Sequence, residues 1–144
     1  MTFEQVTFAS PAFDDVLRLR DEVLRQPLNL QFTIKQITDE YTNLHFACYD
    51  KNRYLLGTLM MKEVAAKYVK MRQVAVAPSA QGQGVGSFMV KQLEQWMLHH
   101  SQYRSIQLAA RTEAVSFYKK LGYTVKGAPF VEVGIPHRHM EKIL

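Results

Sequence analysis

One continuous stretch of the chain carries most of the information about its fold, and it reads Val74-Ala75-Val76-Ala77-Pro78-Ser79-Ala80-Gln81-Gly82-Gln83-Gly84-Val85-Gly86-Ser87. The valines and alanines before Pro78 are typical of a buried strand, which the proline ends. Apolar residues at helical spacing follow, beginning with Val85, Met89 and Leu93. Glycine has no Cβ atom, so alternating glycines at the start of a helix let its unpaired backbone amides approach a ligand. The stretch therefore predicts a strand, an anion-binding loop and a helix.

Regular elements are also expected on both sides of this loop. Alternating or continuous apolar runs predict strands at 3–8, 44–49, 54–63, 68–77, 105–110, 123–125 and 138–143. Apolar residues three or four apart predict helices from Pro11 to a stop at Pro27, at 33–41, from the glycine loop to about His100, and at 113–121. The order predicts an α/β fold with a mixed, mainly antiparallel sheet flanked by helices, in one domain over residues 1–144.

The strand at 68–77 leads into the loop, so its two faces matter. Strict alternation places Val69, Met71, Gln73 and Ala75 on one face and both remaining valines, Val74 and Val76, on the other. Arg72 lies within the same strand. It is a candidate to bind an acidic group of a substrate, or else a surface cation.

Composition restricts the class of protein. Of the 144 residues, 47% are hydrophobic, which is enough for a core and excludes a disordered chain. The single cysteine, Cys48, excludes an internal disulfide and is expected to pack in its apolar strand. No apolar run approaches the ~18 residues of a membrane helix, and the start Met1-Thr2-Phe3-Glu4 predicts no signal peptide. We therefore expect a cytoplasmic protein without a membrane partner.

The charge is unevenly distributed along the chain. Residues 1–50 carry four basic and eight acidic side chains, whereas residues 51–144 carry fourteen basic and five acidic ones. A cationic region of this kind either favours an anionic ligand or merely solvates a surface. No run of five like charges and no dense basic helical stripe occurs, so we expect no nucleic-acid partner.

Two common phosphate-binding loops do not fit. A dinucleotide-binding loop requires Gly-x-Gly-x-x-Gly and an acidic residue at the end of the next strand. Here the third glycine comes one residue early, and the next strand ends Ala109-Ala110-Arg111. A P-loop requires Gly-Lys-Ser or Gly-Lys-Thr, and Gly86-Ser87 lacks the lysine.

The loop instead resembles motif A of the GNAT superfamily of acyl-CoA-dependent N-acyltransferases, which is Arg/Gln-x-x-Gly-x-Gly/Ala after a strand that ends in Val-x-Pro. Gln81, Gly84 and Gly86 occupy its fixed positions. The later stretch 114–123, Ala-Val-Ser-Phe-Tyr-Lys-Lys-Leu-Gly-Tyr, resembles the family's Ala-x-x-Phe-Tyr-x-x-x-Gly-Phe/Tyr motif. The tail 130–137 is similar to that of the small bacterial ElaA/YjcF-like subgroup. The resemblance covers roughly residues 15–144.

This resemblance implies an N-acetyltransferase that uses acetyl-CoA as its co-substrate and no metal. The CoA pyrophosphate would lie on the backbone of Gln81, Gly82, Gln83, Gly84, Val85, Gly86 and Ser87. The pantetheine arm would pair with strand backbone at Val74, Ala75 and Val76, whose amides would also stabilise an oxyanion. The family commonly has an asparagine three residues before Ala114, and this chain has Arg111 there. Arg111 is a candidate for the same arm through a phosphate or carbonyl, but the asparagine's role does not carry over.

The resemblance also implies direct attack by the substrate amine, without a covalent enzyme intermediate. Tyr118 is the candidate to meet the departing thiolate, either acidified by neighbours such as Lys119 and Lys120 or as a hydrogen-bond donor. The protonated amine needs a base, and the candidates are Glu132, His137 and Glu63, in that order. His137 and His139 share a strand face, but a metal site would need a third ligand, so we expect no metal.

Other functions remain open at this point. The chain is either an N-acetyltransferase acting on a small-molecule amine or a protein amino group, a non-catalytic acyl-CoA-binding or sensing domain, or a basic nucleic-acid-binding module. Loss of turnover in a Tyr118→Phe variant that still binds acetyl-CoA separates the first two. A homodimer formed through a sheet edge or the last strand is also left open by the sequence.

Overall fold

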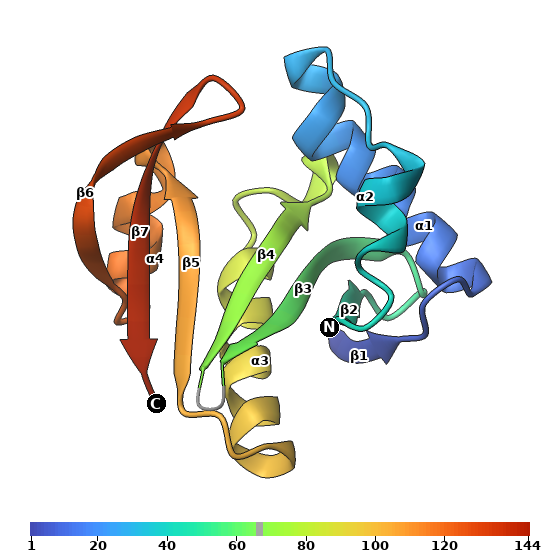
Figure 1. The fold of residues 1–144 in the computed structure, drawn as a ribbon. Helices are drawn as coiled ribbons and strands as arrows, with labels where there is room; N and C mark the ends of the chain where they lie inside the picture. Colours follow the sequence, from blue (N-terminus) through green and yellow to red (C-terminus); the bar gives the residue numbers. More distant parts are fainter. Residues whose placement is uncertain (66–67) are drawn as a thin grey trace.

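A single twisted sheet of seven strands organises the computed structural model (Figure 1), which describes residues 1–65 and 68–144. The strand order is β1-β2-β3-β4-β5-β7-β6, and every neighbouring pair is antiparallel except the parallel pair β4–β5. The strands are β1 (Thr2–Val6), β2 (Leu44–Tyr49), β3 (Leu55–Ala65), β4 (Tyr68–Val76), β5 (Ser105–Arg111), β6 (Thr124–Glu132) and β7 (Ile135–Ile143). The mixed, mainly antiparallel sheet expected from the sequence is confirmed.

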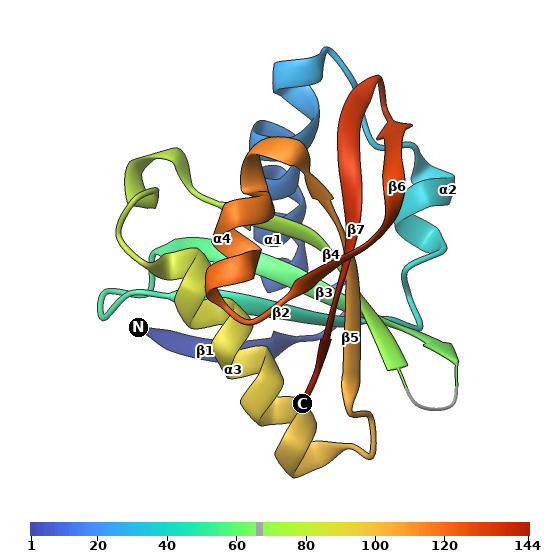
Figure 2. The same cartoon turned by 90° about the vertical axis from the view of Figure 1, so that its left-hand side faces the viewer.

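Helices cover both faces of the sheet (Figures 1 and 2). They are α1 (Pro11–Arg20), α2 (Ile34–Thr38), α3 (Val85–His100) and α4 (Val115–Lys120). Helices α3 and α4 contribute to the larger buried cluster, whereas α1 packs with β1 and β2 in a smaller one. No helix in the described part of the chain is long and apolar enough to cross a membrane.

Helix α1 begins as the sequence predicts but ends earlier. Ser10 is its N-cap, and its hydroxyl accepts a hydrogen bond from the Phe13 amide. The α-helix stops at Arg20 rather than near Pro27, and a π-helical turn over Asp21–Arg25 and a 3-10 turn over Gln26–Leu28 follow. The Arg20 side chain is 1% exposed and donates to both carboxylate oxygens of Glu40, at 2.8 and 2.9 Å. This buried ion pair ties the end of the helix to the segment before β2.

Strand β4 contains a bulge that overturns the predicted division of its faces. Thr58 of β3 lies opposite Ala75 and Met60 lies opposite Arg72, so β4 has one extra residue between these pairs. Gln73, at φ 53°, lies in this bulge. Because one extra residue reverses the alternation, Val74 and Val76 pack in the same cluster as Met71, and not on the opposite face.

Strands β4 and β5 separate before β4 reaches the bulge. Their parallel pairing is limited to three residue pairs, from Tyr68↔Ser105 to Lys70↔Gln107, although both strands continue further. Figure 1 shows the two strands diverging from this point. The β5 side of β4 is therefore an open strand edge in the middle of the sheet from Met71 onward.

The last two strands are much longer than the sequence predicts. They form a hairpin that turns at Val133 and Gly134, with φ of 46° and 75°. The prediction ended the sixth strand at Val125. In the structure the strand continues past Gly127 and Pro129, and a register shift lies between Lys126 and Phe130. The consequence for the site is that the tip of the hairpin reaches past the end of β5.

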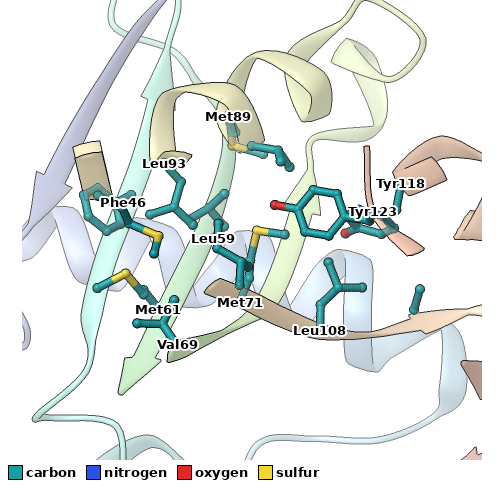
Figure 3. Packing of buried hydrophobic residues seen from close by; sticks show 14 of the residues in the cluster. Phe46, Leu59, Met61, Val69, Met71, Met89, Leu93, Leu108, Tyr118 and Tyr123 are labelled. Carbon is teal, nitrogen blue, oxygen red and sulfur yellow. The ribbon is translucent and has the colours of Figure 1, made fainter. Parts of the chain in front are cut away.

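The larger cluster is rich in methionine and tyrosine (Figure 3). Met71, Met89 and Leu93 pack between the sheet and α3, and the rings of Tyr118 and Tyr123 lie 5.8 Å apart at one end of the cluster. Tyr123 is 2% exposed, and its hydroxyl has no hydrogen-bond partner among the described residues. A buried hydroxyl without a partner lowers stability.

We expect the Tyr123→Phe substitution to raise the free energy of unfolding by about 1 kcal/mol at neutral pH, since it removes an unsatisfied polar group without creating a cavity. Burial, followed by the charge of Glu94, raises the pKa of Tyr123. A raised pKa contributes stability that is complete below about pH 10 and is lost at higher pH, so the gain should grow in alkaline solution. Urea unfolding at neutral pH and above pH 10 measures both effects, and a less stable variant would contradict the assignment.

Candidate active site

The glycine loop turns the start of α3 toward open space. Gly82 and Gly84 have φ of 78° and 81°, and nothing lies within 4 Å of a Cβ atom built at either position. Gly84 is the N-cap of α3, and its carbonyl accepts the first helical hydrogen bond from the Phe88 amide. Within the described part of the chain, the amides of residues 85–87 form no hydrogen bond with protein atoms. These amides and the positive end of the helix dipole make a site for an anion.

The third glycine has a different role from the first two. A Cβ atom at Gly86 would lie 3.3 Å from Cζ of Phe117 and 3.8 Å from Cγ2 of Val76. Gly86 therefore allows α3 to pack closely against α4 and β4, a packing role that the sequence analysis did not distinguish from ligand contact. Gln81 also has a structural contact, because its Nε2 atom donates to the Val76 carbonyl at 3.1 Å.

A cleft of about 410 Å³ opens where β4 and β5 separate. One wall is the open edge of β4, including Val74, and the other is the end of β5 from Leu108 to Arg111. Tyr118 of α4 and the hairpin residues Glu132 and His137 complete the lining. The structure thus brings together Arg111, Tyr118, Glu132 and His137, which come from four different elements. Ala75, Val76 and residues 81–87 lie on the strand and loop that lead away from this cleft.

Tyr118 lies between the core and the cleft. Its side chain is 8% exposed, and burial raises its pKa to about 12. Lys119 and Lys120 are exposed on the same helix, and neither lowers the pKa of Tyr118. Of the two roles left open by the sequence, acidification by neighbours therefore does not fit. A neutral phenol that donates a hydrogen bond does fit.

Glu132 and His137 face each other across the hairpin. His137 is 6% exposed, and its Nδ1 atom lies 2.7 Å from the Ile135 carbonyl. A carbonyl only accepts, so Nδ1 donates, and in the neutral imidazole Nε2 then has the free lone pair. Nε2 lies 3.8 Å from a carboxylate oxygen of Glu132. Two acceptor atoms at this separation can both receive hydrogen bonds from an ammonium group placed between them.

Other sequence candidates lie elsewhere. Glu63 is exposed on β3 opposite Val69 and does not line the cleft. Cys48 is buried in the core. His139 is exposed, with its ring stacked 4.1 Å from that of Phe130. The described residues contain no group of three or more His, Cys, Asp or Glu side chains that is arranged to hold a metal.

Two arginines complete the cleft. Arg72, a sequence candidate, points its half-buried side chain here, together with Arg25 at the end of the π-helical turn. Sequence reasoning missed Arg25. The only local signal was its position just before Pro27, and nothing in the sequence indicated that the helix would open into a π turn that reaches the sheet.

Comparisons with known proteins agree on one family. Residues 18–144 match the model of the Acetyltransferase (GNAT) domain. The chain is 33% identical over 132 residues to a Bacillus subtilis protein described as the uncharacterized N-acetyltransferase YjcF, a match that covers 89% of this chain and 90% of that protein.

Solved structures share the fold. Escherichia coli ElaA superposes with a TM-score of 0.82 at 20% identity, with 99% of both chains covered. A GNAT family acetyltransferase from Elizabethkingia anophelis with acetyl-CoA bound superposes with a TM-score of 0.75 at 17% identity, with 99% of this chain and 97% of that chain covered. Together with the family match and the glycine loop, they identify this chain as a member of the GNAT acetyltransferase family, an acyl-CoA-dependent N-acyltransferase.

Proposed function

We propose that the protein transfers the acetyl group of acetyl-CoA to a primary amine within the cleft between β4 and β5. The observation that carries this proposal is the open edge of β4, which lies directly before the glycine loop. A ligand with a phosphate end and an extended amide-containing arm fits both features, because the loop provides free amides and the strand edge provides a hydrogen-bonding ladder. The family relative with acetyl-CoA bound supports the same ligand.

The residues of the chain divide this binding between them. The amides of residues 81–87 would hold the pyrophosphate, and the backbone of Val74 and Ala75 would pair with the pantetheine arm. The Val76 carbonyl already accepts a hydrogen bond from Gln81, so Val76 would contribute mainly its amide and side chain. Arg111, at the end of β5, would contact the arm or a phosphate from the other wall.

The chemistry follows from the side chains in the cleft. Bound acetyl-CoA supplies the acyl group and a thiolate leaving group. The amine nitrogen attacks the thioester carbon, a C–N bond forms and the C–S bond breaks. His137 Nε2 accepts the proton that the ammonium loses before the attack, and the Glu132 carboxylate accepts the second proton, which the nitrogen loses after the C–N bond has formed. The backbone amides at the open edge of β4 would stabilise the negative oxygen, and the thiolate leaves as the C–S bond breaks. Tyr118 donates a hydrogen bond to the sulfur as its charge develops.

The side chains in the cleft do not support a non-catalytic acyl-CoA sensor, which the sequence had left open. The convergence of Tyr118, Glu132 and His137 on one cleft favours an enzyme, because a sensor needs no proton acceptor beside the thioester. We propose a single domain over residues 1–144, because all the strands form one sheet. A cytoplasmic location and pairing of two copies through β1 or β6, the edge strands, stay predictions.

Calorimetric titration of acetyl-CoA into the protein, with NADH as the control ligand, tests the binding site. We expect saturable binding of acetyl-CoA and none of NADH.

The Gly84→Ala variant should weaken acetyl-CoA binding at least tenfold, because a Cβ atom at φ 81° shifts the amides at the start of α3. Left-handed backbone costs a non-glycine residue about 1–2 kcal/mol, so stability should also fall.

The Gly127→Ala variant is the matched control. Gly127 also has a left-handed φ, of 74°, and open space around a Cβ atom, but it lies on β6 away from the loop. We expect a similar loss of stability with unchanged acetyl-CoA affinity. Equal affinities in the two variants, or no binding of acetyl-CoA to the unmodified protein, would refute the role of the loop.

A further inference from the structure

The lining of the cleft carries a strong excess of positive charge. Arg25 and Arg72 line the cleft and also a second, adjoining hollow of about 210 Å³ between the π-helical turn, α2 and β4. Lys70 and Arg111 add two further cations, and among the described residues Glu132 is the only carboxylate in the cleft lining. The two hollows therefore meet at a positively charged site, and its arginines line the same cleft as Glu132 and His137.

These arginines are not neutralised by the protein. Within the described residues, no carboxylate forms an ion pair with Arg25, Arg72 or Arg111. The carboxylates of the second hollow are already used, because Glu40 pairs with Arg20 and Asp39 pairs with Lys35. Half-buried guanidinium groups without partners are unfavourable unless an anion binds them.

The Arg25 side chain is held in place before any ligand arrives. Its guanidinium carbon lies 4.4 Å from the centre of the Phe32 ring, and that of Arg20 lies 4.8 Å from the same ring. Burial, followed by the charges of Arg20 and Arg72, lowers the pKa of Arg25, whereas the charge of Glu132 acts in the opposite direction. A fixed guanidinium fork binds a planar or tetrahedral anion with little further loss of freedom.

We propose that the acceptor is a small amine that also carries a carboxylate or phosphate group, which Arg25 and Arg72 bind while its amine lies between Glu132 and His137. This inference rests on the proposed acetyl transfer and specifies its substrate class. The same cations would stabilise the neutral form of the bound amine relative to the ammonium, which assists proton loss. They would also repel polycationic acceptors.

Matched pairs of acceptors test this directly in an acetyl-CoA turnover assay. One arm compares α-amino acids with their carboxamides, and another compares glucosamine 6-phosphate with glucosamine, so that the carboxylate and phosphate sources are distinguished. Spermidine represents the polycations. We expect kcat/KM to be at least tenfold higher for the anionic member of a productive pair. The carboxamides contain more free amine at neutral pH, so this comparison is biased against the proposal.

Variants then assign the preference to these residues. Arg72→Gln and Arg25→Gln should each bring the ratio of kcat/KM within the productive pair close to one, mainly through a higher KM for the anionic member. Acetyl-CoA affinity should stay within twofold, and kcat/KM for the neutral member should fall much less than kcat/KM for the anionic member. Arg18→Gln is the control, because Arg18 is an exposed residue of α1 that pairs with Asp15. Thermal unfolding of each variant confirms that it is folded.

The outcomes separate this inference from the proposed function. Faster turnover of neutral amines or spermidine than of every anionic acceptor overturns the inference and leaves acetyl transfer intact. If the ratio of kcat/KM within the productive pair is unchanged in both the Arg25→Gln and the Arg72→Gln variants, the assignment of the preference to these two residues is overturned. Failure of acetyl-CoA to bind in calorimetry overturns the proposed function itself.

Discussion

The Tyr118→Phe variant is expected to lose roughly 10- to 150-fold in kcat while its acetyl-CoA affinity stays within twofold. This range corresponds to the loss of one hydrogen bond to a charged group, about 1.5–3 kcal/mol. The phenol is not expected to transfer its proton completely. With its pKa at about 12 and that of a thiol near 8.5, full transfer would be uphill by about 5 kcal/mol.

The Tyr123→Phe variant is the matched control for this measurement. Its ring lies 5.8 Å from that of Tyr118 in the same cluster, but Tyr123 does not line the cleft. We expect its kcat to match that of the unmodified protein. Unchanged turnover in Tyr118→Phe would show that the hydroxyl has no catalytic role, and weaker acetyl-CoA binding with normal kcat would assign it to binding alone.

Replacing His137 with asparagine should lower kcat/KM by roughly 100-fold or more at pH 7, the usual effect of removing a general base. The asparagine side-chain nitrogen can take the place of Nδ1 and still donate to the Ile135 carbonyl, whereas the Nε2 lone pair is lost. The defect should become smaller as the pH rises toward the pKa of the free amine, because the substrate then arrives without the extra proton.

The activities of the His137→Asn variant and the unmodified protein can be compared up to about pH 10 without ionising Tyr118. The pKa of Tyr118 lies at about 12, so its hydroxyl keeps its proton up to about pH 10. The Glu132→Gln variant should show a smaller defect with the same dependence on pH, since it removes the second acceptor and retains the imidazole. A His137→Asn defect that is constant from pH 7 to about 10 would indicate a positional role and not a proton-accepting one.

The elements that the sequence predicted well are those whose signals are local. The Ser10-Pro11 cap, the strand from Leu44 to Tyr49 and the helix that begins at Val85 all depend on neighbouring residues. The loop glycines were also recognisable, because their spacing, the absent lysine after Gly86 and the absent acidic residue at the end of the next strand exclude the other phosphate-binding loops.

The parts that were missed depend on contacts between distant segments. The bulge at Gln73 exists only in relation to the register of β3, so strict alternation assigned Val74 and Val76 to the wrong face. The hairpin extends through Gly127 and Pro129 because β7 is long enough to pair beyond them. Arg25 reaches the cleft because a π-helical turn follows α1, and the amino-acid composition of this segment does not predict such a turn.

The exposed tip of the β6–β7 hairpin affects how the acceptor specificity of this protein can evolve. The wall that faces the acetyl donor is formed by residues that also hold the core together, such as Tyr118 and Gly86. Val133, at the turn of the hairpin, lines the cleft and is 48% exposed, and surface substitutions usually alter stability by less than about 0.5 kcal/mol. Substitutions at the hairpin turn can therefore change which acceptor binds at little cost in stability. Substitutions in the wall that faces acetyl-CoA would also disturb the core, so that wall is expected to change more slowly.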